Sequence, residues 1–142
     1  MLVRCLYASR AASPIDASTL DAILRKSREN NTPRGITGLL CIAADVFIQV
    51  IEGGRAPVNE LIKSIFADDR HRDVHLLVYE EISERRFHDW AMGQVNMNKI
   101  NPAMLLKYSE KAEINPFDSS GSTTMALINE LLATGAIVNR AN

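Results

Sequence analysis

The stretch from residue 39 to residue 53, LLCIAADVFIQVIEG, constrains the fold of this chain more than any other. Two apolar runs lie on either side of a very short connection around Asp45, which is the pattern of a tight β-hairpin. In the second run, the residues on both sides of the pleat are apolar. We therefore predict a central hairpin in a sheet that other elements cover on both faces.

Strands and amphipathic helices flank this hairpin in a definite order. Asp16 is the expected N-cap of the first helix, and Pro57 lies near the start of the second, which has apolar residues at i, i+3 and i+4 spacing. The order β-α-β-β-α-β is that of an α+β, ferredoxin-like sandwich with both helices on one face of the sheet. The expected elements are a strand at 2–8, a helix at 16–30, the hairpin, a helix at 55–69, a charged loop at 68–73 and a strand at 74–82.

An extra strand and a two-helix cap are expected after this core. Alternation from Ala91 predicts the strand, residues 101–110 predict a short helix, and residues 122–138 predict a longer one that Ser122 or Thr123 caps. The cap can cover the sheet face opposite the first two helices, or pack against a second subunit. We therefore divide one structural unit into a core at residues 1–98 and a helical cap at residues 99–142.

Composition narrows the possible functions. The 142 residues are 46% apolar, enough for one core, and the net charge of −1 gives no field that would draw the chain onto nucleic acid or an anionic membrane. Cys5 and Cys41 lie inside apolar runs, which is typical of reduced core cysteines. The first residues do not resemble a signal peptide, and no window is long enough to span a bilayer. We expect a soluble, cytoplasmic protein.

The sequence contains none of the common catalytic or metal-binding motifs of enzymes. His71, His75 and His88 lack the spacing of metal ligands, so no metal site is expected. There is no HExxH, GxSxG, P-loop or GxGxxG pattern. We therefore expect no substrate turnover.

Gln49 is the polar residue that most needs an explanation. It lies in the middle of an apolar strand, and a buried amide is costly unless its donors and its oxygen have partners. The predicted topology places the strand of Gln49 beside that of Tyr7, so the phenol and the amide can bond to each other and to a third group. A purely structural bond remains the alternative at this point.

Other polar and aromatic residues have two interpretations. Asn30 and Asn31 end the first helix either as a C-cap pair that tolerates left-handed backbone or as a clamp for the polar edge of a planar ring. Trp90 and Met92 are typical of core packing. The charged loop is either solvated or brings two of its residues, Arg70 and His71, to a phosphate.

Five ordered motifs together resemble the BLUF domain, a blue-light receptor module that binds flavin. They are Tyr7-Ala8-Ser9, the NN pair followed by RGITG, the strand VFIQVIEG, the DxRH loop and RRFHDWAMG. The resemblance covers residues 1 to about 97. The residues that follow are similar to the two-helix cap of short, stand-alone members of the family, although this match is weaker.

The resemblance implies a flavin between the two helices, with FAD favoured over FMN or riboflavin. Gln49 would bridge Tyr7 and the N5/O4 edge of the ring, and either Trp90 or Met92 would complete that network. Asn31 would bond the C4 carbonyl and N3. The remaining expected contacts are Ile23 and Ile65 on the two ring faces, Asn30 and Asp68 beside the pyrimidine edge, Arg70 and His71 near the ribityl or phosphate end, and Ser9.

The same resemblance implies a light sensor. Electron and proton transfer from Tyr7 and rearrangement of Gln49 would change the bonds to the flavin, and the change would pass through the last strand to the C-terminal helices. The expected partner is an effector on a separate chain, such as a cyclic-dinucleotide phosphodiesterase or a transcriptional regulator. A homo-oligomer is also expected, without direct binding to nucleic acid or membrane.

Two other functions are compatible with the element order alone. A small enzyme of the acylphosphatase type would need an anion-binding loop after the first strand, where Arg10 is the only candidate. A dimeric interaction module without a ligand would leave Tyr7, Gln49 and Asn31 to satisfy one another.

Overall fold

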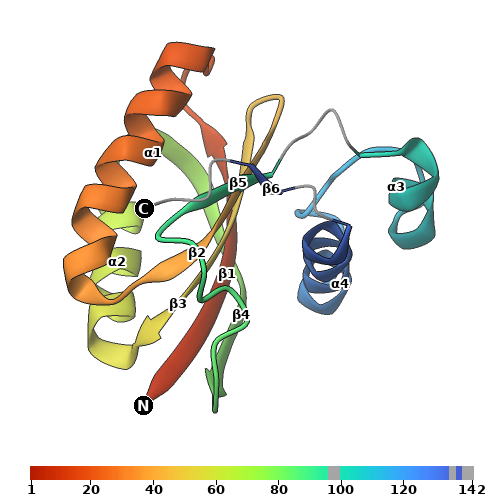
Figure 1. Ribbon diagram of the computed structural model, residues 1–142. Coiled ribbons are helices and arrows are strands. Elements are labelled where there is room, and N and C mark those ends of the chain that lie inside the picture. The colour runs from red at the N-terminus through yellow and green to blue at the C-terminus, as the bar shows by residue number, and fades with distance from the viewer. Residues whose placement is uncertain (96–99, 135–136, 139–142) are drawn as a thin grey trace.

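A six-stranded sheet with helices on both faces forms the body of the computed structural model, which describes residues 1–95, 100–134 and 137–138. The helices α1 and α2 cover one face and α4 covers the other (Figure 1). The elements are β1 Leu2–Ala11, α1 Ala17–Asn31, a 3-10 turn at Thr32–Arg34, β2 Thr37–Ala43, β3 Val46–Gly54, α2 Arg55–Ala67, β4 His71–Ile82, β5 Gly93–Val95, α3 Pro102–Tyr108, α4 Gly121–Ala133 and β6 Ile137–Val138.

The predicted hairpin and topology are confirmed. Strands β2 and β3 pair antiparallel around a turn at Ala44 and Asp45, where Ala44 has a positive φ of 56°. The strand order is β4-β1-β3-β2-β5-β6, so β1 and β3 are neighbours inside the sheet. Both have side chains buried on both faces, which explains why the hairpin sequence is apolar on both sides.

The first helix begins as predicted, and its end differs from the capping interpretation. The Asp16 side chain accepts a hydrogen bond from the backbone N–H of Thr19, as an N-cap does. Asn31 has right-handed helical backbone, and the left-handed residue of the turn is Gly35, with φ 67°. The Asn pair is therefore not a left-handed C-cap, because the chain continues through a 3-10 turn before it reverses.

The fourth strand is longer than expected. It begins at His71, so residues 71–73 of the predicted charged loop belong to the sheet. The reason is that β1 extends to Ala11, and Ala11 pairs with His71. The turn between α2 and β4 is therefore short, and it places Asp68 and Arg70 close to the ends of both elements.

The C-terminal part corrects two expectations. Ser120, and neither Ser122 nor Thr123, caps α4. The next residue, Gly121, lies close to β4. A Cβ at this position would be 2.4 Å from the carbonyl oxygen of Leu77, so only glycine lets the helix start here. The helix ends at Ala133, and Ile137–Val138 pairs with β5 as a strand instead of continuing the helix to residue 138.

The predicted strand from Ala91 begins at Gly93 and pairs parallel to β2. Residues 96–98 of that prediction lie outside the described residues. Among the helices that the structure describes, none has the length and apolar character needed to cross a membrane. The same residues contain no group of three metal-ligating side chains.

Candidate functional site

A cavity of about 390 Å³ lies between α1 and α2, above β1 and β3. This volume falls within the roughly 300–1,000 Å³ of typical cofactor pockets. Apolar and polar side chains alternate around it, as expected for a site that encloses a flat ring and orients its polar edge. The lining residues that carry the argument are Tyr7, Ile23, Asn31, Gln49, Ile65 and Asp68.

Tyr7 and Gln49 meet at the floor of the cavity, as predicted. They are directly opposite each other in the β1–β3 register, and only 3% and 7% of their surfaces are exposed. The Tyr7 hydroxyl donates a hydrogen bond to Oε1 of Gln49, and Nε2 of Gln49 donates to Sδ of Met92 at 3.2 Å. The buried amide therefore has a partner on each side.

Met92, and not Trp90, completes this network. Met92 is fully buried and packs in the cluster on the cavity side of the sheet. Trp90 packs in the cluster on the opposite face, together with α4 residues such as Leu127. Among the described residues, nothing accepts a hydrogen bond from Nε1 of Trp90. The chain path between β4 and β5 thus places the two neighbouring candidates on different faces.

Burial controls the protonation of Tyr7. It raises the pKa of the phenol well above the usual value, and the charge of the Asp68 carboxylate raises it further. Tyr7 therefore holds its proton at neutral pH.

The walls of the cavity come from the two helices. Ile23 on α1 and Ile65 on α2 both line it, as expected of residues that flank a planar ring. Asn31 is buried and lines the cavity, whereas Asn30 is exposed and reaches only its edge. Asn31 is thus the better placed of the two amides.

Charged residues from the short turn after α2 line another part of the cavity. The Arg70 guanidinium bonds both carboxylate oxygens of Asp68 and holds the pKa of that carboxyl at about 2. His71 also lines the cavity, and its Nδ1 lies 2.8 Å from Oγ of Ser9. Burial lowers the pKa of His71, which keeps the ring neutral at pH 7. Ser9, which was expected to contact the cofactor, is fully buried and does not line the cavity; its hydroxyl contacts the cavity residue His71.

Several cavity residues were not identified from the sequence. Two of them, Lys26 and Arg34, are cationic. Helical spacing could have found Lys26 and Ser27, because they lie one turn beyond Ile23, and Leu61, which lies one turn before Ile65. The other residues missed are Ser13, Ile15, Thr19, Leu40, Phe47 and Ser64.

Arg10, the residue an acylphosphatase-type enzyme would require, is engaged elsewhere. Its guanidinium lies 4.4 Å from the ring centre of Phe117 and 3.8 Å from carboxylate oxygens of Asp45 and Asp73. Two acidic neighbours make this a poor place for an anionic substrate. The surroundings of Arg10 therefore do not favour an enzyme of the acylphosphatase type.

Comparison with known proteins identifies the family. The sequence model described as "BLUF: Sensors of blue-light using FAD" matches residues 2–93. Among curated relatives, subunit beta of a photoactivated adenylate cyclase from Euglena gracilis is 32% identical over 107 residues, which are 72% of this chain and 12% of the relative.

Two solved structures resemble the whole chain. The photo-activated state of BlsA matches with a TM-score of 0.80 and 30% identity, and the match covers 93% of this chain and 95% of that one. The dark-state structure of BlrB, a BLUF protein, matches with a TM-score of 0.78 and 32% identity over 94% of this chain and 96% of that one. By contrast, the chain spans only 8–12% of the length of the first curated relatives.

The residues of the cavity fit a flavin nucleotide. A ring can lie between Ile23 and Ile65, and the buried amides of Asn31 and Gln49 supply donors and acceptors for its polar edge. The cationic side chains in the lining suit a phosphate. Family match, fold and cavity agree, and the chain belongs to the BLUF family of flavin-dependent blue-light sensors, which use FAD.

Proposed function

We propose that light acts on this protein by rearranging the hydrogen bonds that join Tyr7, Gln49 and Met92. The observation that supports this most directly is the buried chain from the Tyr7 hydroxyl through the Gln49 amide to the Met92 sulfur at the cavity floor. Each group in the chain has a partner, so a change in one bond obliges the others to change.

FAD would be held by the residues that line the cavity. Ile23 and Ile65 would flank the ring, and Asn31 would bond its polar edge, with Asn30 beside it. Asp68 would lie nearer the pyrimidine edge, and Arg70 and His71 would lie near the ribityl or phosphate end, with Ser9 next to His71. When bound, the flavin supplies absorption of blue light and an excited state that accepts one electron.

Tyr7 would provide the electron. Its phenol is protonated, and loss of an electron makes the hydroxyl strongly acidic, so the proton moves along the existing bond toward Oε1 of Gln49. Electron and proton later return to the Tyr7 oxygen. No substrate is consumed and no product is released. Tyr7 and Gln49 would therefore act as a switch and not as catalytic residues.

Gln49 would be the part that changes. In the observed arrangement its oxygen faces Tyr7 and its amide nitrogen faces Met92. Rotation or tautomerisation of the side chain would place a donor opposite the Tyr7 oxygen. Because a thioether cannot donate, the rearrangement by rotation would also end the bond to Met92 and free the amide to form a new one. Because each hydrogen bond contributes about 1 kcal/mol net, exchanging one bond of the amide for another changes the free energy little, and the switch can revert in the dark.

An absorption spectrum, recorded in the dark and then under blue light, tests this proposal. The protein loaded with FAD should show a red shift of the flavin band that decays in the dark. Tyr7→Phe and Gln49→Leu should abolish the shift and retain the fold. Tyr79→Phe is the matched control, because that hydroxyl bonds Asn59 on the surface. A normal shift in either cavity variant would refute the role assigned to its side chain.

The output of the switch is part of the same proposal. The Euglena relative is named as a subunit of a photoactivated adenylate cyclase, and the part similar to this chain is 12% of its length. Here the helical cap at residues 99–142 would carry the signal from the core at residues 1–98 to an effector on a separate chain. Three further features stay predictions. The effector is a cyclic-dinucleotide phosphodiesterase or a transcriptional regulator, the protein forms a homo-oligomer, and it is located in the cytoplasm.

A further inference from the structure

Residues 83–92 connect β4 to β5 without a helix or strand, and segment 86–92 is the part of this connection that leads into β5. Irregular segments of this kind are usually among the more mobile parts of a fold. This one carries Met92, whose sulfur accepts the bond from Gln49 at 3.2 Å. A thioether is a weak acceptor, so the contact depends on accurate placement of the segment.

Glu52 holds the first end of this segment. Its carboxylate accepts hydrogen bonds from the backbone N–H groups of Arg86 at 2.9 Å and Phe87 at 2.7 Å. The side chain is fully buried, and Arg4 neutralises it through Nε at 2.8 Å and a second nitrogen at 2.7 Å. Glu52 follows Gln49 by three residues on β3, so the two side chains lie on opposite faces of the sheet.

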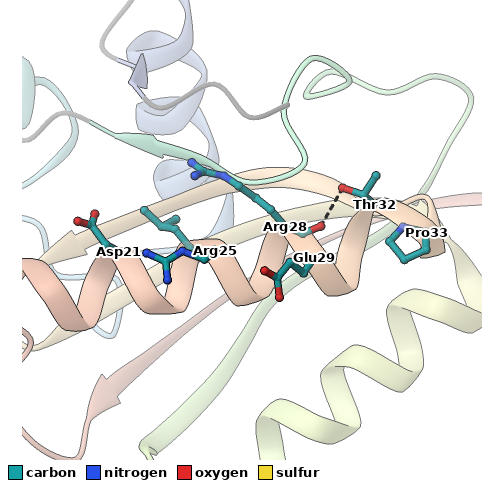
Figure 2. Close-up of a pocket in the computed structure, with 7 residues that line it drawn as sticks. Asp21, Arg25, Arg28, Glu29, Thr32 and Pro33 are labelled. Carbon is teal, nitrogen blue, oxygen red and sulfur yellow. Dashed lines mark hydrogen bonds between the residues drawn. The ribbon is translucent and has the colours of Figure 1, made fainter.

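Arg28 holds the other end. Its Nε donates a hydrogen bond of 3.1 Å to the carbonyl oxygen of Met92 itself. Figure 2 shows the side chain leaving α1 on the side of β5, along a shallow groove that Asp21, Arg25 and Glu29 also line. Arg28 does not line the flavin cavity, so its contact with Met92 is made from outside the site.

A third contact fixes the middle of the segment. The backbone N–H of Gly38 donates to the carbonyl oxygen of Trp90 at 2.9 Å. Gly38 is required here because a Cβ would lie 2.1 Å from the carbonyl oxygen of Val50. The segment is thus bound at its beginning, middle and end by groups from β3, β2 and α1.

We infer that Arg28 and Glu52 are positioning residues that hold segment 86–92 and thereby keep the Met92 sulfur beside the Gln49 amide. This inference rests on the proposed function. The two residues act from opposite faces of the sheet, one through the carbonyl of Met92 and the other through the N–H groups at the start of the segment. In the photocycle they set a difference in free energy: that between Gln49 bonded to the Met92 sulfur and Gln49 after its rearrangement.

The test compares Arg28→Ala with Arg25→Ala in the full chain. Arg25 is an exposed arginine on the same helix and lines the same groove, so it controls for loss of charge. The first measurement is amide hydrogen exchange of the segment in the dark, without added FAD. We expect exchange in residues 86–92 to accelerate at least roughly tenfold in Arg28→Ala and to remain unchanged in Arg25→Ala.

The second measurement is dark recovery of the FAD-loaded protein. Arg28→Ala should retain the red shift, and its lit state should last at least about threefold longer. Recovery needs the segment to present the Met92 sulfur to Gln49, and the released segment does so for a smaller fraction of the time. In a Met92→Leu background, which removes the sulfur, Arg28→Ala should have no further effect on recovery. Arg28→Lys should restore part of the wild-type rate, because lysine can also donate to the carbonyl.

Glu52→Gln, with Glu84→Gln as its exposed control in the same connection, should change exchange and recovery in the same direction as Arg28→Ala. If Glu52→Gln does not fold, the Arg28 variants decide alone. Exchange or recovery in Arg28→Ala equal to that of Arg25→Ala, or an undiminished effect in the Met92→Leu background, overturns the inference. A wild-type protein without any red shift overturns the proposed function instead.

Discussion

The two faces of the sheet are built from the same strands but packed in different ways. On β1, Tyr7 points to the face with α1 and α2, whereas Leu6 and Ala8 point to the face with α4. The first face encloses a cavity with buried polar groups, and the second is a continuous apolar cluster. The fold therefore separates the switch, which needs space and hydrogen bonds, from the packing that stabilises the chain.

The segment 86–92 joins the two faces. It places Met92 in the cavity network and Trp90 in the apolar cluster, and its Arg86 side chain donates a 2.9 Å hydrogen bond to Asn129 on α4. A change at Gln49 thus has a short physical connection to the helical cap.

The largest effect is expected from weakening the apolar face. Leu131→Ala removes a fully buried side chain of α4 and should lower the free energy of unfolding by about 2–5 kcal/mol. The red shift of the folded, FAD-loaded protein should remain, because the residues that produce it lie on the other face. Urea denaturation and absorption spectra measure the two quantities.

Leu106→Ala is the control for this prediction, since Leu106 is an exposed leucine on α3 and its loss should change stability by less than about 0.5 kcal/mol. A folded Leu131→Ala protein that has lost its red shift would show that the two faces are not separate in function.

An effect of intermediate size on the free energy of unfolding is expected at acidic pH, and it comes from His71 on the cavity face. Burial depresses the pKa of His71 below its usual 6.5, although Asp68 opposes this shift. Above pH 6.5 the group is neutral in both the folded and the unfolded chain. As the pH falls below 6.5, the unfolded chain takes up a proton more readily, so the free energy of unfolding should decrease until the folded pKa is passed. His71→Gln should remove this part of the decrease in acid titrations of stability.

His75→Gln is the matched substitution, because His75 is exposed on the same strand. If both variants show the same pH dependence of stability, burial of His71 is not its cause.

The smallest effect is expected at the pair of Asp68, which is partly buried, and Arg70, which is largely exposed. Arg70 is largely exposed, so Arg70→Ala should cost less than about 1 kcal/mol. It should also raise the pKa of Asp68 from about 2 toward 3.8, because the guanidinium bonds are lost. The pair contributes stability above pH 3.8 that is lost as the pH falls toward 2, and the variant should lack this contribution. An NMR titration of Asp68 measures the shift, and Arg25→Ala should leave it unchanged.

Regular elements and their neighbours could be predicted from the sequence. The apolar run at residues 46–52 and the element order were enough to place Tyr7 beside Gln49, because strand order in this topology fixes which strands are adjacent. Helical spacing was likewise enough to direct Ile23 and Ile65 toward the same cavity. These features depend on local periodicity, which a sequence records directly.

Features fixed by distant contacts could not be predicted. The choice of Met92 over Trp90 depends on the path of an irregular segment, and that path is set by Glu52 and Arg28, which lie far from it in sequence. The start of α4 depends on how closely β4 approaches Gly121. In both cases, nearby residues offered equally good local signals.

Trp90 is the only tryptophan of the chain, and its buried indole lies within the apolar cluster with Nε1 unpaired among the described residues. Indole emission depends on the polarity around the ring and on its distance from other chromophores. The protein therefore contains an intrinsic fluorescent probe on the segment that joins its two faces. Emission from this single residue should report movement of the segment in the unmodified protein, without any attached label.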